Sequence, residues 1–290
     1  MASNKRNFKA LAELFKPRFL HRLAMDDYKD LLSEVLVASG SIKEFSKIKR
    51  LPTLFKKAYS ALLSHCKYEY VYKTAILNDV FLKYHNFNSA FYTTEFYCGK
   101  SKADIAIFNG CSTVYEIKTK YDNLEKLDKQ LRDYRKIFSK QFVVVDCKHL
   151  VNVKKIVDSS VGILLFQEDG ALLEIRNAVE DAAGIDTGAL FDCLHKKEYK
   201  DIVHKYIGRE LAVPNALEYA SYKKIFVELP REDAMSQVVE RLRSRSIPTQ
   251  RRALLEKSPS CLGQAIIDSN LTVSMSMSII SKMEKPFAII

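Results

Sequence analysis

Apolar residues recur at intervals of three and four through the first part of the chain. Such spacing places them on one face of a helix, and the leucines and phenylalanines of the stretch 11–36 follow it. Ser39-Gly40-Ser41 interrupts the pattern, and a basic segment that keeps the helical spacing follows over residues 43–57. The sequence therefore predicts a helical N-terminal extension over residues 1–66.

The pattern then changes from helical to extended. A further helical run begins at Glu69, and the aromatic and threonine residues of Phe91–Tyr97 are typical of a strand. Two apolar, β-branched segments flank Asn109-Gly110, a strong signal for a hairpin. The run Phe142–Asp146 is apolar almost throughout, which predicts a central strand buried on both faces. Together these segments predict an α/β fold, and the pattern beyond Gly184 predicts a helical C-terminal region.

Charged residues of the hairpin fall on one face or the other according to the length of its loop. A two-residue loop would set Asp104 opposite Tyr115 and turn its carboxylate to the apolar side. A three-residue loop, 109–111, sets Asp104 opposite Glu116 and gives the hairpin isoleucines one consistent face. A slip of one residue inverts every side chain, and glycine fits the left-handed position of such a loop. We therefore expect Asp104, Glu116 and Lys118 to converge at one end of the hairpin.

This convergence points to metal-dependent chemistry. Two neighbouring carboxylates repel each other unless a cation lies between them. Mg²⁺ takes oxygen ligands and keeps several waters, so Asp104, Glu116 and a substrate phosphate are enough to hold it, and Mn²⁺ accepts similar ligands. Lys118 would orient or deprotonate a water, or neutralise charge at the phosphorus. The pattern predicts phosphodiester hydrolysis, and the alternative is an exposed hairpin whose Glu and Lys are simply solvated.

These residues resemble the motif of the PD-(D/E)XK, or restriction-endonuclease-like, nuclease superfamily. Asp104 takes the place of the Asp and Glu116-Ile117-Lys118 that of the (D/E)XK, while Ala103 stands where the name has proline. Gln130-Leu-Arg-Asp-Tyr134 is similar to the Gln-x-x-x-Tyr motif of RecB-like nucleases. More closely, the pattern resembles a poorly characterised group of bacterial proteins assigned to this superfamily. The resemblance covers roughly residues 68–179.

The resemblance implies a fold and a division of the chain. The fold would be a restriction-endonuclease-like αβββαβ core with a mixed sheet, flanked by N- and C-terminal helical regions. The core would occupy residues 67–180, after the extension of residues 1–66, and a mostly helical region would occupy residues 181–290.

The resemblance also implies further site residues. Nucleases of this superfamily often take an additional acidic ligand from the helix before the hairpin, which points to Glu69. Glu95 is a second candidate, because its strand is expected to neighbour that of Asp104. Gln130 would support the catalytic arrangement from the following helix. Asp122 and Glu125 have the spacing of a capping box, which predicts where that helix begins.

Charge and composition narrow the class of partner. The 290 residues include 47% apolar and 28% charged residues, which is ordinary for a soluble globular protein. A net charge of +11 and a pI near 9.2 favour a polyanionic partner, nucleic acid before membrane. The six cysteines form no Cys-x-x-Cys pair, so neither a zinc site nor a disulfide framework is indicated. With no apolar run of membrane-spanning length, a cytoplasmic location is expected.

The sequence thus predicts a Mg²⁺- or Mn²⁺-dependent deoxyribonuclease, and the family resemblance alone suggests a role in defence against foreign DNA. Two other classes of function stay open at this stage. One is a module on the same fold that binds nucleic acid without cleaving it. The other is a helical regulatory or interaction protein. RNA as the substrate, a homodimer and a protein partner are also compatible with the sequence.

Overall fold

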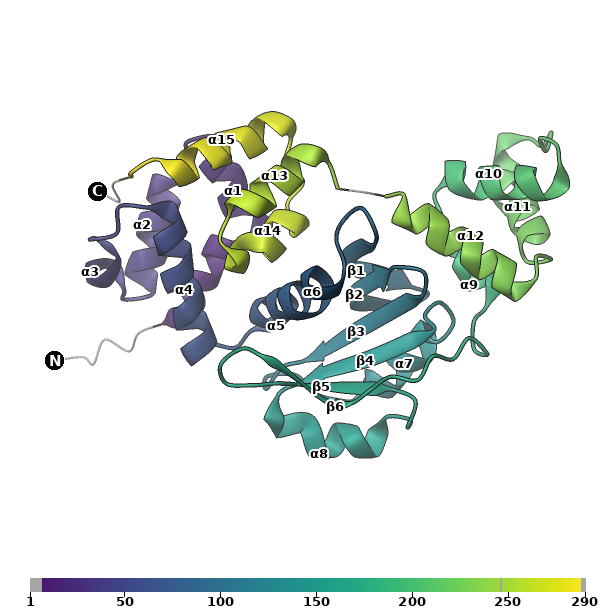
Figure 1. Cartoon of the computed structure of the whole chain (residues 1–290), viewed down its shortest axis with the longest axis horizontal. Coiled ribbons are helices and arrows are strands. Elements are labelled where there is room, and N and C mark those ends of the chain that lie inside the picture. The colour runs from purple at the N-terminus through teal and green to yellow at the C-terminus, as the bar shows by residue number, and fades with distance from the viewer. Residues whose placement is uncertain (1–6, 246, 288–290) are drawn as a thin grey trace. The chain divides into compact units, whose positions relative to one another are not determined.

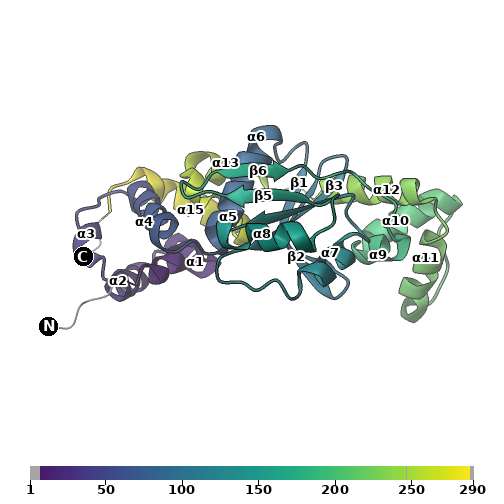
Figure 2. The same ribbon diagram turned by 90° about the horizontal axis from the view of Figure 1, so that it is seen from below.

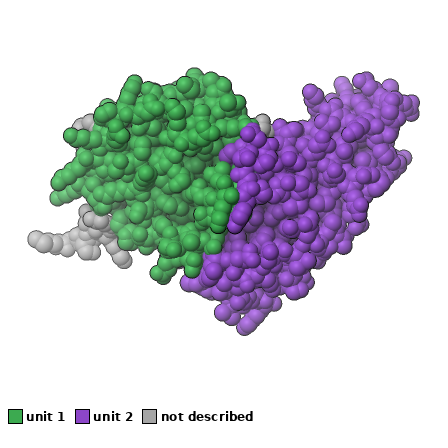
Figure 3. Space-filling view, viewed as in Figure 1, with its two compact units in different colours: residues 1–83, 166–172, 247–290 green, residues 84–165, 173–246 purple. Residues whose placement is uncertain are grey.

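The computed structural model describes residues 7–245 and 247–287 (Figure 1). The chain forms two compact units, which Figure 3 colours separately. Unit 1 comprises residues 1–83, 166–172 and 247–290, and unit 2 comprises residues 84–165 and 173–246. Unit 1 is therefore assembled from both ends of the chain.

Unit 1 is mainly helical in its described residues. Its N-terminal elements are η1 (Phe8–Phe15), α1 (Pro17–Ala24), α2 (Lys29–Ala38), α3 (Ile42–Phe45), α4 (Leu51–His65), α5 (Glu69–Ala75) and the π-helical turn η2 (Ile76–Phe81), continued by α6 (Leu82–Tyr84). Its C-terminal elements are α13 (Thr249–Lys257), η4 (Ser260–Leu262), α14 (Gly263–Asp268) and α15 (Val273–Glu284). Pro17 and Pro52 lie in the first turns of α1 and α4, where the missing N–H has no partner to lose.

Helices from the two ends of the chain pack against each other in unit 1. α14 and α15 both contact α1, and α15 also contacts α4. Phe15, Phe19 and Phe55 are buried, and the Phe55 ring packs against Phe15 with a tilted geometry and against Phe19 edge-on. The predicted helical N-terminal region is therefore confirmed, and its apolar faces are covered in part by helices that lie more than 200 residues later in the sequence.

Unit 2 is built on a mixed sheet. In the described residues its strands are β1 (Phe91–Cys98), β2 (Ser101–Phe108), β3 (Ser112–Lys118), β4 (Lys140–Val145), β5 (Gly162–Phe166) and β6 (Leu172–Arg176), paired in that order. β1, β2 and β3 are antiparallel neighbours, whereas β3, β4 and β5 run parallel. The parallel connections pass through α7 (Leu127–Tyr134) and α8 (Cys147–Ile156). Residues 166–172, at the tip of the last hairpin, are assigned to unit 1.

The hairpin register agrees with the expectation from the sequence. Ile105 pairs with Tyr115, and Phe108 pairs with Ser112, which leaves a three-residue loop. Gly110 in this loop has φ of +117°, a conformation that favours glycine. Continued by one residue, the same register sets Asp104 opposite Glu116, so the predicted three-residue loop is confirmed.

The remainder of unit 2 is helical in its described part. It comprises α9 (Thr187–Asp192), α10 (Lys196–Ile207), η3 (Asn215–Leu217), α11 (Glu218–Phe226) and α12 (Arg231–Arg243), which group together in both views (Figures 1 and 2). Phe226 and Val238 of these helices share one apolar core with Val114 of the sheet and Phe138 after α7. This shared core fixes α7 against the face of the sheet that carries Glu116.

The mixed α/β architecture with flanking helices is confirmed, whereas the finer restriction-endonuclease-like core and the three-segment division of the chain stay predictions. Among the described residues, no helix has the length and apolar character needed to cross a membrane. The predicted capping box is wrong, because α7 begins only at Leu127. Asp122 instead accepts hydrogen bonds of 2.7 Å from the backbone N–H and the hydroxyl of Thr119. Its carboxylate thus closes the turn that follows β3.

A partly buried ion pair between Glu198 and Arg245 in the helical part of unit 2 leads to a pH-dependent prediction. Glu198 accepts hydrogen bonds from Arg245 Nε at 2.8 Å and from the backbone N–H of His195 at 2.6 Å. Burial works to raise the pKa of Glu198, but these two donors outweigh it and hold the pKa below its usual value. A carboxylate with a lowered pKa stabilises the folded state above its unfolded pKa, and this stabilisation is lost as the pH falls through the folded pKa.

We therefore expect Glu198→Gln to lower the free energy of unfolding by on the order of 1 kcal/mol at pH 7. The difference between variant and wild type should shrink as the pH falls below about 4. Urea unfolding followed at pH 7 and pH 3 measures both values. A difference of equal size at the two pH values would show that the ion pair is not its cause.

Candidate active site

Two neighbouring strands bring the predicted acid and base groups together. Side chains alternate along a strand, so Glu116 and Lys118 of β3 share one face. Both are buried, with 2% and 7% of their surface exposed. Lys118 Nζ donates to Glu116 Oε1 at 2.7 Å and to Gln130 Oε1 at 3.0 Å. Buried charges need paired and hydrogen-bonded partners, and this pair has both.

Helix α7 supplies the other partners of Glu116. Gln130 and Tyr134 lie four positions apart and therefore on the same helix face. Gln130 Nε2 donates to Glu116 Oε1 at 2.6 Å, and the Tyr134 hydroxyl donates to Glu116 Oε2 at 2.6 Å. Glu116 thus receives hydrogen bonds on both oxygens. The predicted supporting contact of Gln130 is present, and it reaches Glu116 as well as Lys118.

Tyr134 is a member of this cluster that the predicted site residues do not include. Burial, followed by the negative charge of Glu116, raises the pKa of Tyr134. The hydroxyl therefore stays protonated near neutral pH and remains a donor to the carboxylate. It also lies 2.9 Å from the carbonyl oxygen of Lys102 in β2. The Gln130-x-x-x-Tyr134 motif was the available signal, but only Gln130 was predicted as a site residue from it.

Asp104 lies where the ladder between β2 and β3 opens. The ladder pairs run from Phe108–Ser112 to Ile105–Tyr115. At the next position the Asp104 carboxylate accepts the backbone N–H of Ile117 at 2.6 Å. The side chain thereby takes a donor that a regular antiparallel pair would give to the main chain. Asp104 is half-buried, so its carboxylate is oriented by β3 yet less enclosed than Glu116.

Glu95 faces Asp104 from β1. The register of the neighbouring pairs, Thr94–Ile105 and Phe96–Ala103, places Glu95 opposite Asp104. Carboxylate oxygens of these two residues lie within 4.8 Å of each other, and Glu95 forms an ion pair of 2.7 Å with Lys102. Glu95 has φ of +55°, a left-handed conformation that costs a non-glycine residue about 1 kcal/mol. Backbone strain of this kind clusters at functional sites.

Glu69 is the predicted site residue that belongs to the other unit. It is the first residue of α5 in unit 1, and it forms an ion pair of 2.5 Å with Lys73 Nζ. The residues that unit 2 brings together are Asp104, Glu116, Lys118, Gln130, Tyr134 and Glu95. The choice between Glu69 and Glu95 as the additional acidic ligand stays a prediction.

The donor set within unit 2 suits a hard divalent cation. Asp104 and Glu95 offer carboxylate oxygens, the ligands that Mg²⁺ and Mn²⁺ prefer. Glu116 Oε2 accepts one hydrogen bond in this cluster, so it retains acceptor capacity toward a cation or a water. A cation would also relieve the repulsion between the Asp104 and Glu95 carboxylates.

Unit 2 is thus a mixed α/β domain with a buried, hydrogen-bonded acid–lysine cluster beside a pair of facing carboxylates. The chain belongs to the bacteriophage P4 protein cII family, whose model matches residues 63–258. A curated relative, Protein cII of Enterobacteria phage P4, is 31% identical over 107 residues, which are 36% of this chain and 40% of that protein. The chain therefore matches less than half of that relative's length. No solved structure matches the chain.

This family membership corrects one prediction from the sequence. The resemblance to the PD-(D/E)XK nuclease superfamily is wrong as a family assignment, because the matching family is that of P4 protein cII. The motif behind the resemblance consists of one acid, a Glu-x-Lys and a Gln-x-x-x-Tyr. A motif of so few positions also occurs by chance in the strands and helices of unrelated proteins. The match to the family model, in contrast, extends over most of the chain.

Proposed function

We propose that this protein is a Mg²⁺-dependent nuclease that hydrolyses phosphodiester bonds of DNA. The observation that carries the proposal is the buried pair of Glu116 and Lys118, with nitrogen and oxygen 2.7 Å apart, next to the oriented carboxylate of Asp104. A purely structural role would not need an ion pair at this position, because well-packed apolar residues are often as stabilising as a buried pair. The proposal rests on this geometry and not on family membership.

Each side chain has a role in the proposed reaction. Asp104 and Glu95 would hold the cation with Glu116, and the bound cation would supply Lewis-acid activation of the phosphate. An ammonium group has three donors. Lys118 gives two of them to Glu116 and Gln130, which leaves the third for the attacking water or a phosphate oxygen. Gln130 orients the Lys118 ammonium and the Glu116 carboxylate at the same time.

The surroundings of the cluster support a nucleic-acid substrate. Lys120 and Tyr121 lie in the turn after β3, and the ammonium of Lys120 lies 5.0 Å from the centre of the Tyr121 ring. Tyr121 is 53% exposed, and exposed aromatic rings beside lysines stack on bases of single strands. The net charge of +11 adds a general attraction for polyanions.

The element order fits such a reaction centre. From α5 to β4 the order is helix, three strands, helix, strand, which is the αβββαβ order expected for a restriction-endonuclease-like core. This is an analogy of fold and carries less weight than the site. A role in defence against foreign DNA rested on the corrected family resemblance, so it is not part of the proposal.

Cleavage of plasmid, linear and single-stranded DNA in Mg²⁺, Mn²⁺ or EDTA tests the proposal. Wild type should cut with either metal and not in EDTA, and Asp104→Asn should cut at least about 10³-fold more slowly. Glu232→Gln changes an exposed carboxylate of α12 in the same way and should cut like wild type.

Other outcomes point to the other classes of protein. DNA binding that weakens with salt, without cleavage in any metal, would favour a binding module. A protein with no affinity for DNA at all would favour a helical regulatory factor.

A further inference from the structure

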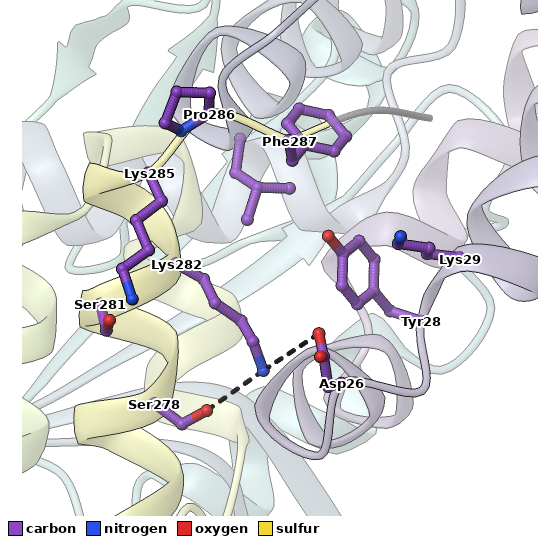
Figure 4. A pocket seen from close by; sticks show the side chains of 10 residues that line it. Asp26, Tyr28, Lys29, Ser278, Ser281, Lys282, Lys285, Pro286 and Phe287 are labelled. Carbon is purple, nitrogen blue, oxygen red and sulfur yellow. Dashed lines mark hydrogen bonds and ion pairs between the residues drawn. The ribbon is translucent and has the colours of Figure 1, made fainter. Parts of the chain in front are cut away.

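Unit 1 contains a cavity of about 470 Å³ that lies far from the acid–lysine cluster in sequence (Figure 4). Small-molecule sites commonly have volumes of about 300–1,000 Å³. Its lining includes Tyr28, Lys29, Ser281, Lys282, Lys285 and Phe287. They come from the start of α2 and from the end of α15 with the segment that follows it.

Hydrogen bonds between the two chain ends hold the walls of this cavity in place. The backbone N–H of Phe287 donates to the carbonyl of Lys49 at 2.9 Å, next to a β-bridge between Arg50 and Pro286. Ser278 Oγ donates to the carbonyl of Ala24 at 2.7 Å. The cavity is therefore part of the folded unit and not a gap beside a loose tail.

Lysines dominate the charge of the cavity. Lys282 donates to the carbonyl of Leu23 at 2.7 Å and lies 3.5 Å from Asp26, so it holds the end of α1 in place (Figure 4). Lys29 and Lys285 have no ion-pair partner within residues 7–245 and 247–287. Asp26 is the acidic residue of the described lining, so the cavity attracts anions.

Tyr28 supplies a hydroxyl that faces the cavity. It is 4% exposed, and its ring packs edge-on against Phe19. Figure 4 shows its hydroxyl pointing toward the space between the lining residues, and within the described chain this hydroxyl has no hydrogen-bond partner. The ring is thus enclosed while the hydroxyl is open to the cavity, where it can donate a hydrogen bond to an acceptor oxygen of a ligand.

We propose that the cavity binds a phosphomonoester, either as a free nucleoside monophosphate or as the 5′-phosphate of a nucleic-acid strand. A phosphomonoester carries about two negative charges and three acceptor oxygens. Lys29 and Lys285 match the charge, and the hydroxyls of Tyr28 and Ser281 match the oxygens. Phe287 adds an aromatic surface for the attached nucleoside. A carboxylate ligand carries one negative charge and two oxygens, so it would leave part of the two lysines and two hydroxyls without a partner.

Calorimetric titration of the full chain in EDTA with deoxyadenosine monophosphate tests this site. Lys285→Ala and Tyr28→Phe should each weaken binding by about tenfold or more, since each loses a hydrogen bond to a charged oxygen. Lys47→Ala removes an exposed lysine of the same unit outside the cavity, and its affinity should equal that of wild type. Circular dichroism checks that each variant is folded.

Two further titrations separate the sources of the phosphate. An oligonucleotide with a 5′-phosphate should bind more tightly than its 5′-hydroxyl form if strand ends are bound, and titrating it into Asp104→Asn protein avoids cleavage. If deoxyadenosine monophosphate binds and the 5′-phosphorylated oligonucleotide does not, the cavity is specific for mononucleotides. Equal binding of deoxyadenosine and its monophosphate, no binding of either phosphate probe, or unchanged affinity in Lys285→Ala would overturn the proposal. None of these outcomes depends on the nuclease reaction.

Discussion

Replacing Glu116 with alanine is expected to lower the free energy of unfolding of unit 2 by about 3–5 kcal/mol. The reason is the position of Lys118, whose side chain is 9% exposed and whose ammonium is 2.7 Å from the Glu116 carboxylate. Without the carboxylate this ammonium stays buried beside Gln130, which neutralises no charge. The hydroxyl of Tyr134 also loses its acceptor at Glu116 Oε2.

Chemical denaturation of a double variant separates the lost charge partner from other effects of the substitution. Glu116→Ala combined with Lys118→Met removes both charges, so it should be less destabilised than Glu116→Ala alone. Glu232→Ala, on the exposed face of α12, should change the free energy of unfolding by no more than about 0.5 kcal/mol. If Glu116→Ala unfolds at the same denaturant concentration as wild type, the buried ion pair does not contribute to stability.

Lys118→Met is expected to lower the proposed cleavage rate by about 10²–10⁴-fold, measured on protein whose fold is checked by circular dichroism. Glu116 loses its charge partner in this variant, which destabilises unit 2 as well, but the carboxylate keeps its hydrogen bonds from Gln130 and Tyr134. What is lost is the ammonium donor directed at the water or the phosphate. Lys118→Arg should restore little activity, because a planar guanidinium does not fit the geometry of a buried ammonium.

Single-turnover cleavage with saturating Mg²⁺ measures this effect, with DNA affinity measured separately in EDTA. Lys154→Met, which removes an exposed lysine from α8, serves as the matched control and should cut like wild type. A Lys118→Met protein that cuts at the wild-type rate would remove Lys118 from the proposed mechanism. A protein that loses DNA affinity and not rate would give Lys118 a role in binding instead.

The pairing register of the hairpin could be predicted because the two-residue periodicity of strands allows few loop lengths. With a period of two, only one loop length gave Ile105 and Ile117 a common apolar face, and this fixed Asp104 opposite Glu116. The supporting contact of Gln130 could be predicted because its position on an amphipathic helix determines the direction of its side chain. These are local arguments, and they needed no knowledge of how distant segments meet.

Other features depend on interactions that a single segment does not encode. The start of α7 was misplaced because Asp122 found donors in the preceding turn instead of the helix. The left-handed conformation of Glu95 arises inside a paired strand, where its sequence neighbours predict regular extended backbone. Helical periodicity likewise showed which faces of α1 and α4 are buried, but not that α15 covers them. The P4 protein cII family could not be identified from short motifs, because membership of it is shown by similarity along residues 63–258.

The origin of unit 1 from both ends of the chain has a consequence for folding during synthesis. The helices up to α5 are synthesised before unit 2, and α13–α15 are synthesised after it. Domains commonly fold as they emerge, so unit 2 is complete while α1 still lacks α14 and α15. Contacts across such sequence separations form slowly. The apolar faces of the N-terminal helices therefore stay exposed until α14 and α15 have been synthesised. Unit 1 is thus the part of the nascent protein that most needs protection from aggregation.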